Sequence, residues 1–143
     1  GPMLQSLQEQ VCDLGLDGQV VFAGAVPDEQ LAAYYAAADL FVLPASERSE
    51  AFGLVQVEAL ATGLPIVSTE LGTGTSYVNA HGESGLVVPP RDSKWLAEAI
   101  ASLLANDALR ARLARGARAR AALFTADRMV QQIQAVYDDL LAD

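Results

Sequence analysis

The sequence predicts an α/β fold in which a parallel sheet is flanked by helices and followed by a helical C-terminal segment. Short runs that are apolar on successive residues are typical of strands buried on both faces. These runs alternate with helical patterns, and a strand–helix–strand order favours parallel strands joined by right-handed crossovers. After Pro89 and Pro90 the strand signal ends, and only helical patterns follow.

Four strands are predicted, at residues 20–23 (VVFA), 40–43 (LFVL), 65–68 (PIVS) and 86–88 (LVV). Four is a small number for a sheet of this class. A doubly wound sheet also normally begins with a strand, whereas here a helical pattern comes first. We therefore expect the chain to be part of a larger domain.

Helices are predicted at residues 4–14, from about residue 28 onward, and at residues 53–62, where Gly63 supplies a stop. Tyr34 and Tyr35 on the second helix are interpreted as residues that pack in the core and on the sheet. Apolar side chains at helical spacing predict three more helices, within residues 96–104, 109–117 and 129–141, the last with Thr125 as its N-cap.

The domain organisation is expected to be simple. Gly1 and Pro2 before Met3 are typical of a cleaved expression tag. Residues 3–143 are interpreted as a single, partial domain, because no internal repeat, low-complexity tract or interdomain linker interrupts them. The chain has 143 residues, of which 52% are hydrophobic and 19% charged, and this composition predicts a globular protein.

The charge distribution argues against a nucleic-acid partner, since the net charge is −9. Up to Pro90 the chain has one cation, Arg48, against eleven acidic residues. A run of arginines follows later and is interpreted as a solvated helix face, with contact to an anionic lipid or an acidic partner as the alternative. The run comprises Arg110, Arg112, Arg115, Arg118 and Arg120.

The location predicted is the cytoplasm, because Cys12 is the single cysteine and no signal peptide is visible. No apolar run reaches the roughly 18 residues that a membrane span needs. Cys12 is predicted to be a small buried side chain. His81 is interpreted as a solvated turn residue rather than a metal ligand, since no second histidine is present.

Ligands of open parallel sheets bind beyond the carboxyl ends of the strands, where the loops after the second and third predicted strands should lie. The helix that follows the first of these loops begins near Phe52, Gly53 and Leu54. Its unpaired backbone N–H groups and its dipole suit a phosphate, and Gly53 permits close approach. Arg48 is the one cation available nearby, so a phosphate here would depend mainly on backbone amides.

Two acids flank that helix start, Glu50 and Glu58, with seven residues between them. Glu58 lies in an apolar helix and needs a partner, and vicinal ribose hydroxyls would supply two hydrogen bonds to its carboxylate. The alternative is an exposed acid without a ligand. Glu50 can point into a cleft at the strand ends, or it can act as a capping acid on the positive helix end.

The stretch SERSEAFGLVQVEALATGLPIVST, residues 46–69, resembles the E-x7-E signature of retaining glycosyltransferases with the GT-B fold, of the large family 4 type. The similarity extends upstream through FAGAVPDEQLAAYYAAADLFVLPAS and downstream through GESGLVVPPRDSKWLAEAIASLLAND, and it covers nearly the whole chain. A lone E-x7-E would be weak, but this order of motifs is specific. Bacterial enzymes that build surface polysaccharides also look similar around GTGTSYVN and HGESGLVVPP.

The resemblance implies a Rossmann-like, donor-binding C-terminal domain, which is one half of a GT-B fold. It implies that Glu50 contacts the donor sugar near the reacting centre as the catalytic residue, and that Glu58 binds the ribose. The backbone from Phe52 to Leu54 would face the donor phosphates, with Arg48 nearby, and Val26 would lie near the base. The donor would be a UDP- or GDP-linked sugar, the anomeric configuration would be retained, and no metal or other cofactor would be needed.

Two departures from the family pattern change the expectation. Relatives carry an arginine and a lysine near the first strand of this domain, but nothing before Arg48 is basic here, and two strands that should precede residues 4–14 are absent. We therefore expect weak donor binding and no sugar transfer by the chain alone. Unpaired strand edges predict a dimer or strand exchange. The acceptor domain would lie elsewhere in the full protein, which is expected at the inner face of the membrane with peripheral contact.

Two other classes of function remain open. An epimerase or a phosphorylase could use the same fold, but Lys94, the only lysine, lies in a polar loop and suits a pyridoxal cofactor poorly. A non-catalytic α/β interaction module is the third class. Binding of nucleoside diphosphates would separate the first two classes from the third.

Overall fold

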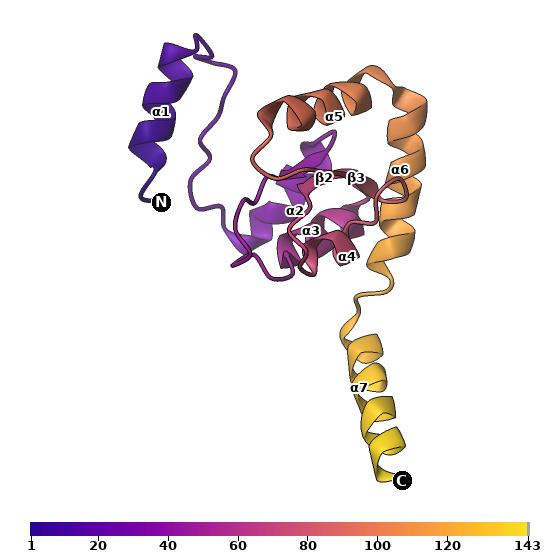
Figure 1. Ribbon diagram of the computed structural model, residues 1–143. Helices are drawn as coiled ribbons and strands as arrows, with labels where there is room; N and C mark the ends of the chain where they lie inside the picture. The colour runs from indigo at the N-terminus through magenta and orange to yellow at the C-terminus, as the bar shows by residue number, and fades with distance from the viewer. Residues whose placement is uncertain (143) are drawn as a thin grey trace. The chain divides into compact units, whose positions relative to one another are not determined.

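The computed structural model describes residues 1–142, which fall into two compact units, residues 1–31 and the residues from Ala32 onward. The first unit contains helix α1 (Leu4–Asp13), and helix α2 (Asp28–Ala37) begins in the first unit and ends in the second (Figure 1). Both helices lie where the sequence predicts them.

The second unit contains a three-stranded parallel sheet in the order β1-β2-β3. Val42 of β1 lies opposite Val67 of β2, and Val67 lies opposite Leu86 of β3. The α/β fold class is therefore confirmed, with three of the four predicted strands. The elements in chain order are β1 (Phe41–Leu43), α3 (Leu54–Thr62), β2 (Ile66–Thr69), α4 (Thr75–Val78), β3 (Gly85–Val88), α5 (Ser93–Ala105), α6 (Asp107–Ala121) and α7 (Ala126–Leu141).

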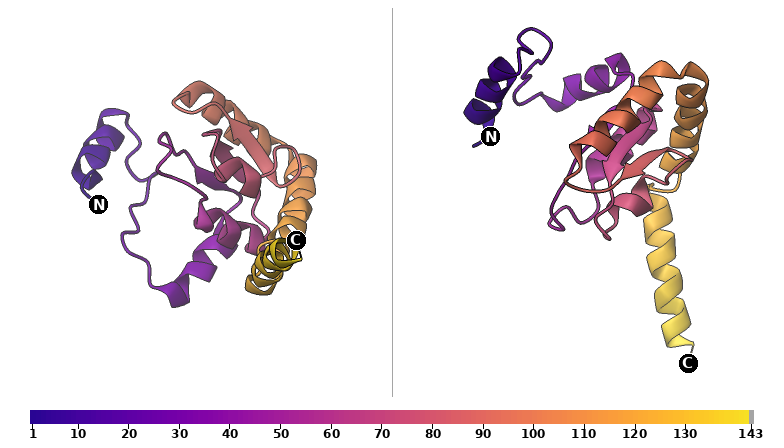
Figure 2. Two further views of the ribbon diagram at one scale, coloured as in Figure 1. Left: turned by 60° about the horizontal axis from the view of Figure 1, so that its bottom comes forward. Right: turned by 45° about the horizontal axis from the view of Figure 1, so that its top comes forward.

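Helices cover both faces of this sheet (Figure 2). Alternate residues of β2 point to opposite faces, so Ile66 packs with α3 and α4, whereas Val67 packs with α5. Helix α6 contributes to both clusters, Ala117 to the first and Leu113 to the second. The C-terminal helix α7 has no buried residue, and its N-cap is the predicted one, since Thr125 Oγ1 accepts a hydrogen bond from the N–H of Arg128 at 3.3 Å.

The predicted strand at residues 20–23 is wrong. These residues form neither helix nor strand, and Val21 is 84% exposed. A strand needs a hydrogen-bonded neighbour, and residues 1–40 contain no other strand that could pair with it. An apolar run therefore indicates side chains that favour burial, but it does not show that the backbone has a neighbouring strand to pair with.

Two predictions of burial on the first two helices are also wrong. Cys12 is exposed. It lies on α1, and no residue of this helix is buried. Tyr34 is 52% exposed, whereas Tyr35 is half-buried, as predicted. Consecutive residues of a helix point about 100° apart, so the side of α2 that partly buries Tyr35 leaves Tyr34 exposed.

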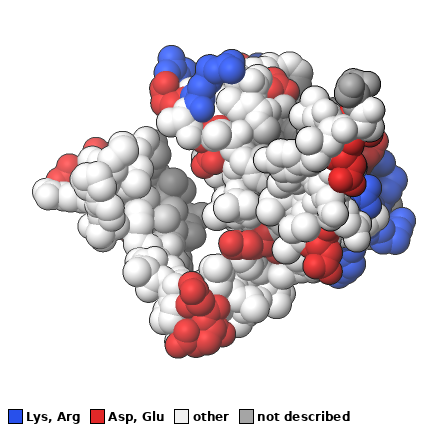
Figure 3. Space-filling view, turned by 90° about the horizontal axis from the view of Figure 1, so that it is seen from below, with Lys and Arg blue, Asp and Glu red and all other residues white. Residues whose placement is uncertain are grey.

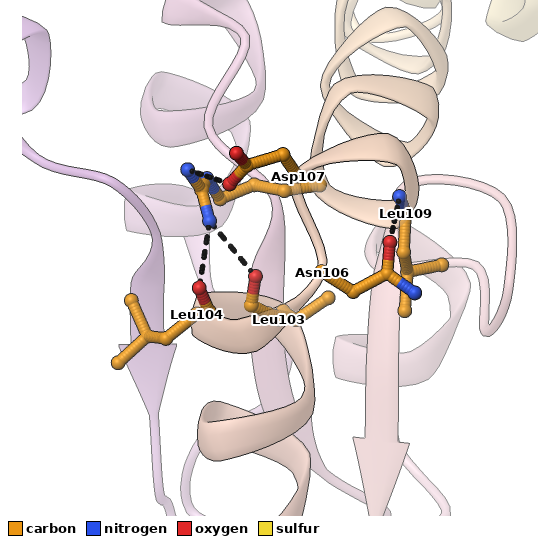
Figure 4. Close-up of polar contacts among 6 residues, drawn as sticks. Leu103, Leu104, Asn106, Asp107 and Leu109 are labelled. Carbon is orange, nitrogen blue, oxygen red and sulfur yellow. Dashed lines mark hydrogen bonds and ion pairs between the residues drawn. The ribbon is translucent and has the colours of Figure 1, made fainter.

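The junction of α5 and α6 is held by polar contacts (Figure 4). Asn106 caps α6, since its Oδ1 accepts a hydrogen bond from the N–H of Leu109 at 2.9 Å. The guanidinium of Arg110 donates to the carbonyls of Leu103 and Leu104, at 3.0 and 3.2 Å, at the end of α5. A cation at this position also suits the negative end of a helix.

Other arginines of α6 bind backbone carbonyls in the same way. Arg112 donates to the carbonyl of Gly82 at 2.8 Å, and Arg118 donates to that of Thr62, the last residue of α3, at 3.5 Å. Arg120 donates to the carbonyl of Val78 at 3.2 Å and lies over the Tyr77 ring. On the face drawn in Figure 3, lysines and arginines gather in two separate groups. The run therefore ties neighbouring segments to α6 and does not only face solvent.

Gly116 of α6 lies where the helix passes the turn before β3. A Cβ at this position would lie 1.9 Å from the Glu83 carbonyl oxygen, which belongs to the backbone and cannot rotate away. Gly116→Ala is therefore expected to lower the free energy of unfolding by about 1–3 kcal/mol, although alanine normally stabilises a helix by about 1 kcal/mol relative to glycine. Urea unfolding measures this change. Arg115→Ala is the control, and an unchanged or raised stability of Gly116→Ala would contradict the prediction.

Candidate functional site

The start of α3 is open toward a ligand. Gly53 is its N-cap residue, with φ 77°, and no described side chain caps this end. A Cβ on Gly53 would lie 2.6 Å from Nε2 of Gln56 and 3.1 Å from Cδ2 of Leu43, so the position requires glycine for both its backbone angle and its close packing. The first N–H groups of a helix lack a partner one turn earlier in it. The Gln56 N–H donates to the Gly53 carbonyl at 2.8 Å, so the N–H groups of Leu54 and Val55 are the ones left for an anion.

The loops after β1 and β2 are joined to each other. The N–H of Gly74 donates to the carbonyl of Ala51 at 2.7 Å, and Thr73 Oγ1 donates to the carbonyl of Glu50 at 3.0 Å. Gln56 Nε2 donates to the Thr75 carbonyl at 3.3 Å. The loop after β2 is therefore tied to the start of α3, and helix α4, which the sequence did not predict, begins within it.

Glu70 and Arg48 both form hydrogen bonds with the loop after β2. Glu70 Oε1 accepts hydrogen bonds from the Gly72 N–H at 2.8 Å and from Ser76 Oγ at 3.0 Å. Arg48 donates to the carbonyls of Leu71 and Gly72, at 3.2 and 3.1 Å. The sequence signalled Arg48 as a phosphate ligand, and that role stays a prediction. Glu70 carried no sequence signal beyond its place at a strand end.

The two acids of the E-x7-E pattern occupy different surroundings. Glu50 is half-buried in the loop before α3, and its carboxylate makes no hydrogen bond within residues 1–142. Glu58 is exposed on α3, and its Oε2 accepts a hydrogen bond from the hydroxyl of Tyr35 at 2.9 Å. The sequence required a partner for Glu58, but it could not identify a tyrosine 23 residues away. Val26 belongs to the first unit and is half-buried there.

The Tyr35 hydroxyl is unusually hard to ionise. Burial, and then its hydrogen bond and charge interaction with Glu58, raise the pKa of Tyr35 from 10.0 to about 12. The folded state therefore holds this proton more tightly than the unfolded state, and the stabilisation is complete below pH 10. It is lost as the pH rises from 10 to about 12. Thermal unfolding across this range should show a steeper loss of stability for the unaltered chain than for Tyr35→Phe, and equal slopes would contradict this expectation.

His81 caps the edge of the sheet. It is exposed, as predicted, and its Nδ1 accepts a hydrogen bond from the Val87 N–H at 3.0 Å. The Gly82 N–H donates to the carbonyl of Gly85 at 2.8 Å. These contacts satisfy outward groups of β3 that another chain could otherwise pair with. No group of three or more His, Cys, Asp and Glu side chains within residues 1–142 is placed to hold a metal ion.

The family is decided by a match over most of the chain. Residues 1–120 match the family model described as "Glycosyl transferases group 1". The chain belongs to this glycosyltransferase group 1 family. The O-antigen chain mannosyltransferase C of Escherichia coli is 36% identical over 142 residues, which are 99% of this chain and 38% of that enzyme.

Solved structures of glycosyltransferases have the same fold as this group 1 domain. The sucrose-phosphate synthase of Thermosynechococcus elongatus superposes with a TM-score of 0.86 at 35% identity, over 99% of this chain and 35% of that one. The Anabaena protein HepE in complex with UDP-glucose has a TM-score of 0.82 at 31% identity, over 95% of this chain and 36% of that one. The architecture is therefore that of a GT-B glycosyltransferase.

The group 1 domain spans only part of such proteins. It covers between 15% and 38% of the length of the curated relatives that it matches. Among residues 1–142 no helix is long and apolar enough to cross a membrane.

Proposed function

We propose that this chain is the donor-binding domain of a retaining glycosyltransferase and that it binds the nucleoside diphosphate part of a UDP- or GDP-linked sugar. The observation that carries the proposal is the open N-terminus of α3 between two acids. Gly53 is the buried N-cap residue, Leu54 after it is exposed, and Glu58 lies four residues beyond Leu54 on the same helix. With a rise of 1.5 Å per residue, these positions lie about 6 Å apart along the helix axis.

This spacing suits a nucleoside diphosphate, because the diphosphate and the ribose are neighbouring groups of one molecule. The diphosphate would rest on the amides near Phe52, Gly53 and Leu54, where the helix dipole favours negative charge. The ribose hydroxyls would donate to the Glu58 carboxylate. The complex of the similar protein HepE with UDP-glucose supports this class of ligand.

Glu50 is proposed as the catalytic residue of the full protein. Its half-buried carboxylate precedes the amides of α3, so a donor sugar attached to the diphosphate would lie near it. A carboxylate there would stabilise positive charge that develops on the sugar ring as the bond to the diphosphate breaks. The amides would stabilise the negative charge of the leaving diphosphate, and transfer would retain the anomeric configuration.

Arg48 and Val26 are proposed as secondary contacts of the donor. Arg48 would reach the diphosphate from the loop after β1, at the expense of its hydrogen bonds to Leu71 and Gly72. Val26 would contact the base. No metal or other cofactor is part of the proposal.

The wider role proposed is synthesis of a bacterial surface polysaccharide in the cytoplasm, with peripheral contact at the inner face of the membrane. The relative named for O-antigen chain mannosyl transfer supports this role. Because the chain covers 38% of that enzyme, acceptor binding is assigned to another part of the full protein. The isolated chain is therefore expected to transfer no sugar, and turnover by the isolated chain would contradict that expectation.

Titration of the chain with UDP and GDP tests the proposal. Nuclear magnetic resonance detects millimolar binding, which suits a site with few cations. We expect one of the two diphosphates to bind, with shifts at the amides of Gly53 and Leu54, and the matching nucleoside monophosphate to bind more weakly. If neither diphosphate binds at millimolar concentration, the donor-binding role is wrong and an interaction module is favoured. Sedimentation of the same sample tests the predicted dimer.

A further inference from the structure

Glu58 receives one hydrogen bond within residues 1–142, from the Tyr35 hydroxyl to Oε2 at 2.9 Å. It lies on the exposed side of α3, where a free glutamate side chain would sample several rotamers. The bond joins α2 to α3 across 23 residues of sequence. A contact of this range restrains an exposed carboxylate that the local helix alone would leave mobile.

Tyr35 is itself held in place by the core. Its ring packs against that of Phe41, the first residue of β1, with centroids 5.9 Å apart and planes inclined by 58°. Both rings pack on the cluster that contains Leu60 and Ile66. The hydroxyl is therefore anchored through the sheet, whereas the neighbouring Tyr34 is 52% exposed.

We propose that Tyr35 is a positioning residue of the nucleotide site: its hydroxyl fixes the Glu58 carboxylate in the orientation that accepts hydrogen bonds from the vicinal ribose hydroxyls. This inference rests on the proposed function. A carboxylate has about four lone-pair sites, and the hydroxyl occupies one of them on Oε2. Oε1 remains for the ribose.

The benefit of this contact is preorganisation. A glutamate that is already fixed loses less conformational entropy when a ligand binds. The Tyr35 hydroxyl is the donor of this hydrogen bond and Glu58 the acceptor, and burial together with this bond raises the pKa of Tyr35 to about 12. The hydroxyl touches neither the reacting sugar nor the diphosphate in this arrangement, so its effect should be confined to recognition of the ribose.

The experiment uses Tyr35→Phe, which keeps the ring and removes the hydroxyl. Binding is measured for the diphosphate that the unaltered chain prefers, UDP or GDP, and for its 2′,3′-dideoxy analogue, which has the same base and phosphates. We expect Tyr35→Phe to weaken binding of the ribose form about two- to tenfold and to leave binding of the dideoxy analogue unchanged. Tyr34→Phe is the matched control and should change neither.

A second comparison uses the Glu58→Ala background, in which Tyr35→Phe should have no further effect on binding. The proposal is overturned if Tyr35→Phe weakens both ligands equally, which is the signature of a structural role, or if it weakens neither. It is also overturned if the effect persists without Glu58. If the unaltered chain binds no diphosphate, the proposed function fails and this inference fails with it, which is a different result from a bound but insensitive site.

Discussion

Glu58→Ala is expected to weaken binding of the preferred nucleoside diphosphate about 10- to 100-fold. The carboxylate would accept charge-assisted hydrogen bonds from the ribose, and such a bond contributes about 1.5–3 kcal/mol, where about 1.4 kcal/mol corresponds to a factor of ten. The fold should survive, because Glu58 is exposed and its side chain makes one hydrogen bond within the described residues. Magnetic resonance titration measures the dissociation constant.

Glu98→Ala is the control for the loss of a negative charge. Glu98 is also exposed and helical, but it lies on α5, which covers the other face of the sheet from α3. Glu98→Ala should change the dissociation constant by less than about twofold, as expected for a screened surface charge. Equal binding by the unaltered chain and Glu58→Ala would reject the ribose role.

Asn79→Ala is expected to cause a large loss of stability. Asn79 is 0% exposed, and its Nδ2 donates to Ser68 Oγ at 2.8 Å and to the Leu86 carbonyl at 3.2 Å. Its Oδ1 accepts a hydrogen bond from Ser84 Oγ at 3.2 Å. Each buried group left without a partner costs about 1–3 kcal/mol. We expect the free energy of unfolding to fall by about 3 kcal/mol or more.

Urea unfolding followed by circular dichroism measures this loss. Ser102→Ala is the control, because this exposed serine donates to a carbonyl within its own helix, and its loss should change the stability by no more than about 0.5 kcal/mol. If Asn79→Ala changed the free energy of unfolding as little as Ser102→Ala does, the buried amide would not hold β2, β3 and the intervening turn together.

Local sequence patterns predicted most of the regular structure. Helix ends followed from single residues such as Gly63, which adopts φ 83° after α3, and Thr125, which caps α7. These signals depend on the backbone of a few adjacent residues, so they act in the same way in any context. The strand at residues 20–23 failed for the opposite reason, because pairing needs a second strand that sequence proximity does not supply.

The candidate site, like the fold, was only partly predictable from local sequence. The order of Glu50, Gly53 and Glu58 was visible in the sequence, since an acid, a helix start and a second acid follow one another within nine residues. The contacts that hold them were not visible. Thr73 reaches the Glu50 carbonyl and Tyr35 reaches Glu58, each across 23 residues. Spacing in sequence does not reveal which distant side chain meets a helix face.

The sequence by itself determined the family signature, the alternation of helices and strands, and the residues that offer amides and carboxylates to a ligand. Those properties are local, because periodicity, capping and motif order each need only neighbouring residues. The tertiary structure alone decided that the arginines of α6 bind carbonyls at the ends of other segments, that His81 caps β3, and that Tyr35 restrains Glu58. These contacts depend on how elements pack together, which is set by long-range burial rather than by any single stretch of the chain.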